Sequence, residues 1–259
     1  MSIGIEVEGN VGIIEMQTPP HNFLTYQLVE SIADALEGFD AGSEVRAAVL
    51  CAEGRSFCAG ANFGGGPAAE GGRREPAGGP STARLYAAAA RLCAVATPFV
   101  AAVHGPAIGG GLGLAMVATL RVTCPDARFS ANFAALGIHP GFGLSVTVPE
   151  VIGPSRAAEV LLTAKRYKGD EAMAIGLADR CVPADQVRAA SIALAGEIAV
   201  NAPLAVRSIH RTLRRGLADR VRQATEHEAA EQLRLSATED AREGMRAVNE
   251  RRSGDFAFR

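Results

Sequence analysis

The sequence contains no tryptophan, few cysteines and no long hydrophobic run. The five cysteines are odd in number and widely spaced, which is typical of free, reduced thiols rather than of disulfides or a zinc site; they are Cys51, Cys58, Cys93, Cys124 and Cys181. No apolar stretch reaches the roughly 20 residues of a membrane span. The first residues lack the basic and apolar regions of a signal peptide. We therefore expect a cytoplasmic protein that has no membrane partner.

Motifs for nucleotide, metal and serine chemistry are also missing. The dinucleotide-binding motif Gly-x-Gly-x-x-Gly is absent, because Leu114 stands where a third glycine would have to follow Gly109 and Gly111. The P-loop motif is absent as well, because no Gly-Lys-Ser/Thr follows a glycine cluster. Gly-x-Ser-x-Gly fails at Ser145, which Val146 and Thr147 follow. No histidine has metal-ligand spacing with Cys or Asp. The formal net charge of −2 argues against nucleic acid as the main partner.

The first part of the chain alternates short apolar runs with amphipathic segments. A hairpin is predicted over 3–8 and 11–17, and buried strands over 46–51 and 99–103. Helical spacing predicts a helix from Leu28 to Phe39 capped by Thr25, and a second one from Ser81 to about Val95. Further short strands are predicted over 120–124 and 128–130. This order predicts an α/β fold, with a core domain over residues 1–183.

The composition changes at about residue 184. Amphipathic helices are predicted around 187–198, after Asn201 with Pro203 in the first turn, from about 220 to 236 and over 239–251, so residues 184–259 form a C-terminal helical region. Their apolar stripes must cover either the core or a neighbouring subunit. Glu226-His227-Glu228 lies on one of these helices and is interpreted as charged surface. Residues 63–80 are rich in Gly and Pro without periodicity, which fits either a floppy insertion or a mobile pocket wall.

The glycine-rich stretch from Gly105 to Ala115 is the centre of the prediction. It follows the apolar run 99–103 and leads into another apolar run from Leu112, so we expect a strand, a glycine turn and the start of a helix. Such a turn leaves backbone N–H groups free, and the helix dipole adds partial positive charge. It can bind a phosphate or a carbonyl oxygen that becomes negative during a reaction. A second turn of the same kind runs from Phe57 to Asn62.

Four segments in order resemble the crotonase superfamily, the enoyl-CoA hydratase/isomerase family. They are Arg55-Ser-Phe-Cys-Ala-Gly-Ala61, Pro98-Phe-Val-Ala-Ala-Val-His-Gly-Pro-Ala-Ile-Gly-Gly-Gly111, Leu136-Gly-Ile-His-Pro-Gly141 and Ala237-Thr-Glu-Asp-Ala-Arg-Glu-Gly-Met245. The resemblance covers essentially the whole chain. It implies a crotonase (ClpP-like) spiral of ββα units with C-terminal helices at a trimer interface, hence a homotrimer or a dimer of trimers.

The resemblance also implies an acyl-CoA thioester ligand and no cofactor beyond the coenzyme A of the substrate. Carried over by motif position, the backbone amides of Ala61 and Gly110 form the oxyanion hole for the thioester oxygen. Contacts to coenzyme A and the acyl group are implied for the residues around these turns and the preceding connector, namely Pro20, His21, Ala59, Ala61, Gly109, Gly110 and Phe133.

The sequence departs from the family at the two positions where hydratases carry glutamates. Gly113 and Phe133 stand there, and neither side chain can transfer a proton. Hydration needs a base that activates water and an acid that protonates the α-carbon. Ordinary hydratase activity is therefore not expected. His139, in the following loop, is the nearest titratable candidate for proton transfer.

Three hypotheses stay open from the sequence. The first is an enzyme that stabilises an enolate or oxyanion of an acyl-CoA, such as an isomerase, decarboxylase or thioesterase, with His139, water or the substrate carrying the proton. The second is a non-catalytic acyl-CoA binding or carrier protein. The third is the family's usual hydratase, with residues supplied from elsewhere.

Overall fold

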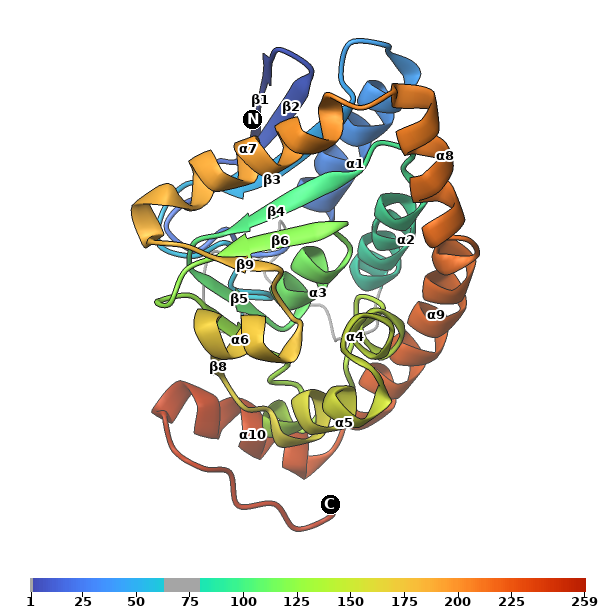
Figure 1. The fold of residues 1–259 in the computed structure, drawn as a ribbon. Helices are drawn as coiled ribbons and strands as arrows, with labels where there is room; N and C mark the ends of the chain where they lie inside the picture. The colour runs from blue at the N-terminus through green and yellow to red at the C-terminus, as the bar shows by residue number, and fades with distance from the viewer. Residues whose placement is uncertain (1, 63–79) are drawn as a thin grey trace.

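A six-stranded sheet forms the centre of the computed structural model, which describes residues 2–62 and 80–259 (Figure 1). Its strands, in spatial order, are β1 (Ile3–Glu8), β2 (Val11–Met16), β3 (Ala47–Ala52), β4 (Phe99–Val103), β6 (Leu120–Thr123) and β9 (Arg180–Cys181). β1 and β2 pair as an antiparallel hairpin, and every other pairing is parallel. All five residues of β4 are buried, as expected of a central parallel strand. The predicted hairpin and α/β class are confirmed.

A second, three-stranded sheet contains β5 (Pro106–Ile108), β7 (Arg128–Ser130) and β8 (Tyr167–Lys168). The sequence predicted one continuous glycine turn from residue 105 to the next helix, and this is wrong for β5. The reason is tertiary pairing. Cys58 N donates to Pro106 O at 3.0 Å and Ile108 N donates to Cys58 O at 3.0 Å, so the two turns hold each other in extended conformation.

Helices fill the connections between strands. They are α1 (Tyr26–Ala41), α2 (Pro80–Ala94), α3 (Gly110–Met116), α4 (Leu144–Ile152), α5 (Pro154–Thr163) and α6 (Gly169–Ile175), with the short 3-10 turns η1 (Ala134–Leu136) and η2 (Ala184–Gln186). The side chain of Thr25 accepts from Leu28 N at 3.1 Å, as the predicted cap requires. Ser81 is not a cap, because α2 already includes Pro80. The rest of the Gly/Pro-rich stretch, 63–79, lies outside the described residues.

The last quarter of the chain is helical, with α7 (Val187–Ala199), α8 (Pro203–Leu213), α9 (Leu217–Ser236) and α10 (Glu239–Glu250). α7 lies against the six-stranded sheet, where it contacts β2, β3, β4 and β6 (Figure 1). α9 packs on α2, and α10 packs on η1. The boundary at residue 183 stays a prediction, as does the trimer.

The five cysteines are free thiols, and four of them are buried. This agrees with the expectation that they do not form disulfides. No single described helix is both long and apolar enough to cross a bilayer. One pair, Ala184–Ala199 with Pro203–Ser236, passes that length and composition test only when taken together across a bend of 107°. Among the described residues, no group of three or more His, Cys, Asp or Glu side chains is arranged to hold a metal ion.

Candidate functional site

The two glycine turns lie against each other at the start of α3. A Cβ at Gly60 would lie 2.4 Å from Ile108 O and 3.6 Å from Gly110 N, and Gly60 has a φ of +76°. A Cβ at Gly111 would lie 2.0 Å from Cys58 O. Only glycine allows backbones to approach this closely. These glycines therefore bring the segment that ends at Ala61 beside the first residue of α3.

The two predicted oxyanion donors have no backbone acceptor among the described residues. Gly109 precedes α3 with φ +56° and ψ −120°, and its own N–H donates to Ser130 O at 2.8 Å. Over residues 2–62 and 80–259, neither Ala61 N nor Gly110 N donates to a backbone carbonyl. Ala61 is exposed and Gly110 is partly exposed, so both can be reached by a ligand. Free N–H groups at a helix start can bind a negatively charged oxygen.

Apolar side chains surround this amide pair. A Cβ at Gly110 would lie 2.5 Å from Cδ2 of Leu24, and one at Gly109 would lie 3.7 Å from Cζ of Phe133. Phe133 is only 8% exposed. Phe133 therefore lies next to Gly109, and its contact with the acyl group stays a prediction. The sequence analysis missed Leu24, which lies on the turn because its amide donates to Gly60 O at 2.9 Å, a long-range contact that no local pattern shows.

Phe142 fills the space beside Gly113. A Cβ at Gly113 would lie 2.7 Å from Cδ1, 2.9 Å from Cβ and 3.0 Å from Cγ of Phe142. Phe142 is 1% exposed and has a φ of +61°, which is unusual for an aromatic residue. The volume into which a side chain at position 113 would project is thus occupied by an aromatic ring. The glycine and the phenylalanine form one packing arrangement, and no sequence pattern reveals it.

The connector before α1 packs on the first glycine turn, and the predicted contacts of its residues with coenzyme A stay a prediction. Pro20 O accepts from Arg55 N at 2.9 Å, and His21 O accepts from Ala59 N at 3.0 Å. The His21 Nδ1 lies 3.2 Å from Ser56 Oγ. Pro20, His21 and Ala59 therefore lie together, next to the segment that carries the Ala61 amide.

The loop that presents Phe142 is held by a buried carboxylate on α9. Glu228 is fully buried, and it accepts from Gly143 N at 2.8 Å, from Ser145 N at 3.1 Å and from Ser145 Oγ at 2.5 Å. The interpretation of Glu228 as charged surface is wrong. Val221, Thr225, Glu228 and Gln232 share the buried face of α9, and three donors satisfy the carboxylate there.

Tyr86 and Gln232 tie the same loop to α2. The Tyr86 hydroxyl donates to Gln232 Oε1 at 2.8 Å, and Gln232 Nε2 donates to His139 O at 2.9 Å. A Cβ at Gly141 would lie 1.9 Å from the Tyr86 hydroxyl oxygen, so this position must be glycine. Burial is the main cause that raises the pKa of Tyr86 well above its usual range, and the phenol stays neutral.

The side chain of His139 points to α9. Its Nδ1 lies 2.8 Å from Pro140 O, and its ring meets that of His227 edge-on with centroids 5.6 Å apart. None of these described contacts joins His139 to the amides of Ala61 and Gly110. The only titratable side chain in the bridge between the two turns is Cys58, and burial raises the pKa of its thiol to about 12. Cys58 is therefore no nucleophile near neutral pH.

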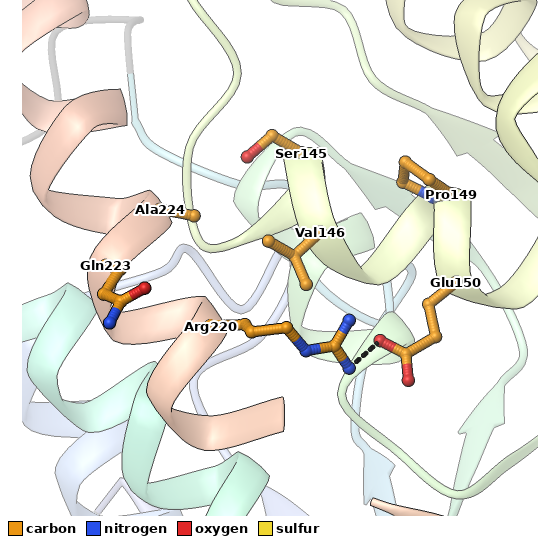
Figure 2. Close-up of a pocket in the computed structure, with 7 residues that line it drawn as sticks. All are labelled: Ser145, Val146, Pro149, Glu150, Arg220, Gln223 and Ala224. Carbon is orange, nitrogen blue, oxygen red and sulfur yellow. Dashed lines mark hydrogen bonds and ion pairs between the residues drawn. The ribbon is translucent and has the colours of Figure 1, made fainter. Parts of the chain in front are cut away.

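A separate open groove of about 730 Å³ lies between α4 and α9 (Figure 2). Arg220 of α9 reaches across it to Glu150 of α4, with an N–O distance of 2.7 Å. Its lining includes none of the residues predicted to form the acyl-CoA site.

The α/β fold thus brings two glycine turns together at the start of α3, where the amides of Ala61 and Gly110 have no backbone acceptor among the described residues. The family described as Enoyl-CoA hydratase/isomerase matches residues 6–259. The chain belongs to this family, and so to the crotonase superfamily, as the sequence motifs predicted.

Relatives and solved structures agree over the full length. The chain is 30% identical over 263 residues to a probable enoyl-CoA hydratase of Mycobacterium bovis, covering 100% of this chain and 98% of that protein. It is 31% identical over 259 residues to the crotonyl-CoA hydratase of Syntrophomonas wolfei, covering 98% and 97%. An enoyl-CoA hydratase/isomerase structure from Pseudoalteromonas atlantica superposes with a TM-score of 0.84 at 27% identity, covering 99% and 100%. The crotonase fold predicted from the sequence is confirmed.

Proposed function

We propose that this protein is an enzyme that binds an acyl-CoA thioester and stabilises an enolate or oxyanion at the amides of Ala61 and Gly110. The observation that carries the proposal is that neither amide has a backbone acceptor among the described residues, while Phe142 fills the side-chain space of Gly113. Charge that develops on the thioester oxygen would be stabilised by donors already in place, each contributing about 3–4 kcal/mol in the transition state. No cofactor is needed beyond the coenzyme A of the substrate.

Ordinary hydration is not the proposed reaction. Adding water across a double bond requires one group to activate the water and another to protonate the α-carbon. Position 113 has no side chain, and position 133 carries a phenyl ring in an apolar setting. The relatives are named as hydratases, which favours hydration, so hydration is included in the test below.

Decarboxylation of a malonyl-type thioester is the reaction that requires the fewest proton-transferring side chains. The bond from the α-carbon to the carboxylate breaks, CO₂ leaves, and the electron pair passes into the enolate, so no base is required. Water or His139 then supplies a proton to the α-carbon. An apolar surrounding such as Phe133 and Leu24 also disfavours the hydrated carboxylate of the substrate. Isomerisation and thioester hydrolysis both require a group that moves a proton before or during the first step.

A non-catalytic acyl-CoA carrier is the second candidate. The observation in its favour is that positions 113 and 133 carry no carboxylate while both glycine turns are present. A carrier keeps the affinity for the thioester but releases it unchanged.

The test is to incubate the protein with malonyl-, enoyl- and saturated acyl-CoA esters in D₂O, with mass spectrometry of products and calorimetric binding in parallel. We expect CO₂ loss and one solvent deuterium at the α-carbon from the malonyl-type ester, and no hydrated enoyl product. Hydration of the enoyl ester contradicts the argument from positions 113 and 133. Tight binding of all esters without any product establishes the carrier.

The role of His139 is tested separately with His139→Ala, using His227→Ala as the matched control because these two rings contact each other. A rate that falls only in His139→Ala, with thioester binding retained, assigns the proton transfer to His139. Equal rates in the two variants remove His139 from the mechanism and leave water as the proton donor.

A further inference from the structure

The two predicted oxyanion donors differ in what fixes their direction. The N–H of Gly110 belongs to the peptide unit whose carbonyl, Gly109 O, accepts from Gly113 N at 3.1 Å at the start of α3. The helix therefore holds this N–H in place. Ala61 lies in no helix or strand, so something else must fix the direction of its N–H. The proposed function leaves this direction unexplained.

The carbonyl of Gly60 determines where the Ala61 amide points. The two groups belong to one trans peptide unit, in which C=O and N–H point in opposite directions. Gly60 O accepts from Leu24 N at 2.9 Å, and no other described backbone N–H donates to it. This hydrogen bond turns Gly60 O toward the connector before α1, so the N–H of Ala61 points away from the connector.

Glycine at position 60 allows this peptide unit to turn over. A peptide flip exchanges the directions of C=O and N–H by changing ψ of one residue and φ of the next, and glycine accepts both conformations. Only glycine fits here, because a Cβ would lie 2.4 Å from Ile108 O. After a flip, Gly60 O would point where the N–H of Ala61 points now and would repel a thioester oxygen. The Leu24 N–H opposes the flip, because it would lose its acceptor.

The side chain of Asn22 holds the Leu24 amide in position. Asn22 is fully buried and has a φ of +47°. Its Nδ2 donates to Glu53 O at 2.7 Å and to Ser56 O at 2.8 Å, and its Oδ1 accepts from Thr18 N at 3.0 Å. These bonds tie the connector to the segment that leads into the first glycine turn.

We propose that the backbone N–H of Leu24, held by Asn22, is the positioning group of the predicted oxyanion hole. It keeps the N–H of Ala61 directed at the ligand and polarises the shared peptide unit, which makes that N–H a stronger donor. The Leu24 N–H points to Gly60 O, so it acts through Ala61 and not on the ligand itself. This inference rests on the proposed function, because it concerns the same two amides.

Replacing Leu24 by its α-hydroxy acid analogue in the full chain tests the proposal. The resulting ester bond removes the N–H and keeps the side chain. The matched control is the same exchange at Phe23, whose N–H donates to no backbone carbonyl among the described residues. The probe is butyryl-CoA with a ¹³C-labelled thioester carbonyl, and isotope-edited infrared spectra measure the carbonyl stretch of the bound ester.

We expect the unmodified chain to lower this stretching frequency, because hydrogen bonds to the oxygen weaken the C=O bond. The Leu24 ester should retain about half of the lowering, because one of the two donors is no longer held in place. On a turned-over acyl-CoA, its kcat should be about tenfold lower. KM should change less, since the donor matters most when charge develops on the oxygen. The Phe23 ester should match the unmodified chain in both measurements.

Asn22→Gly carries the test if the ester protein does not fold. Glycine accepts a φ of +47° and removes the side-chain hydrogen bonds, so this variant should also reduce the infrared shift. Equal shifts in the unmodified chain, the Leu24 ester and Asn22→Gly overturn this inference and leave the proposed function standing. An unchanged carbonyl frequency for butyryl-CoA bound to the unmodified chain overturns the proposed function as well, because the thioester then does not lie at these amides.

Discussion

An alanine at position 113 would place its Cβ 2.7 Å from Cδ1 of Phe142. A Cβ atom almost never comes this close to a non-bonded heavy atom. Phe142 cannot easily withdraw, because its ring is fully buried and its Cβ would also lie 2.9 Å from the new atom. Overpacking of this kind costs about 1–3 kcal/mol. We therefore expect Gly113→Ala to lower the free energy of unfolding by that amount, although alanine is the better helix former.

The cost of Gly113→Ala should become smaller when the ring of Phe142 is removed. Phe142→Ala alone should cost about 3–5 kcal/mol because it leaves a cavity. In that background the alanine at position 113 no longer meets the ring atoms and has only the Cβ of position 142 nearby, at 2.9 Å, so its cost should fall well below about 1–3 kcal/mol. The two substitutions are therefore coupled, as expected of residues in direct contact.

Urea unfolding followed by circular dichroism, at one fixed protein concentration, measures all four members of this cycle. Gly38→Ala is the control, since Gly38 lies inside α1 and a Cβ there meets nothing within 4 Å. It should stabilise the protein by about 0.5–1 kcal/mol. Equal effects of Gly113→Ala in both backgrounds would show that Phe142 does not fill this space, and would refute the packing argument against a carboxylate at position 113.

Three further predictions concern the residues that hold the site. Burial lowers the pKa of His210 to about 4 in the folded protein, against about 6.5 in the unfolded chain. Between these pH values the unfolded state binds more protons than the folded state. The free energy of unfolding should therefore fall as the pH drops from about 6.5 to about 4. This loss should be reduced in His210→Gln, as seen in unfolding titrations at several pH values. Glu228→Gln should lower the free energy of unfolding by about 2–3 kcal/mol, because the amide nitrogen would then face the N–H groups of Gly143 and Ser145. The exposed control, Glu226→Gln, should change it little in the same unfolding titration. Gly60→Ala should destabilise more than Gly9→Ala in thermal melts, because both have positive φ but only position 60 meets a carbonyl, at 2.4 Å.

Local patterns were sufficient to predict most helices and strands. Apolar spacing located α1, and the hydroxyl of Thr25 identified its start, because a cap depends on a few neighbouring residues. The start of α2 was placed one residue late, since Pro80 is compatible with the first helical position and Ser81 only resembled a cap.

Features that depend on tertiary pairing could not be predicted in this way. β5 is extended because Cys58 pairs with it across nearly 50 residues of chain. Glu228 was misinterpreted because a glutamate among charged neighbours is usually exposed, and its donors come from a loop 83 and 85 residues away in sequence.

The candidate site was predicted in part. Glycine turns show where backbone amides can be left free, but the choice of Ala61 and Gly110, and of Gly113 and Phe133 as departures, came from the resemblance to the family, and their roles stay predictions. The sequence could not predict that the ring of Phe142 lies over Gly113 or that the side chain of Leu24 lies over Gly110. An apolar residue in a loop does not indicate which residue it covers.

The central claim is that the Gly110 amide stabilises the thioester oxygen, and a comparison of Gly110→Pro with Gly110→Ala tests it most directly. Both variants add a Cβ next to the Leu24 side chain, 2.5 Å from its Cδ2, but only proline removes the N–H. Proline is also accepted at the first position of a helix. We expect kcat of the proline variant to be about 10²–10³ lower than that of the alanine variant on the turned-over acyl-CoA, with similar stability of the two proteins. Equal rates in the two variants would contradict the oxyanion hole.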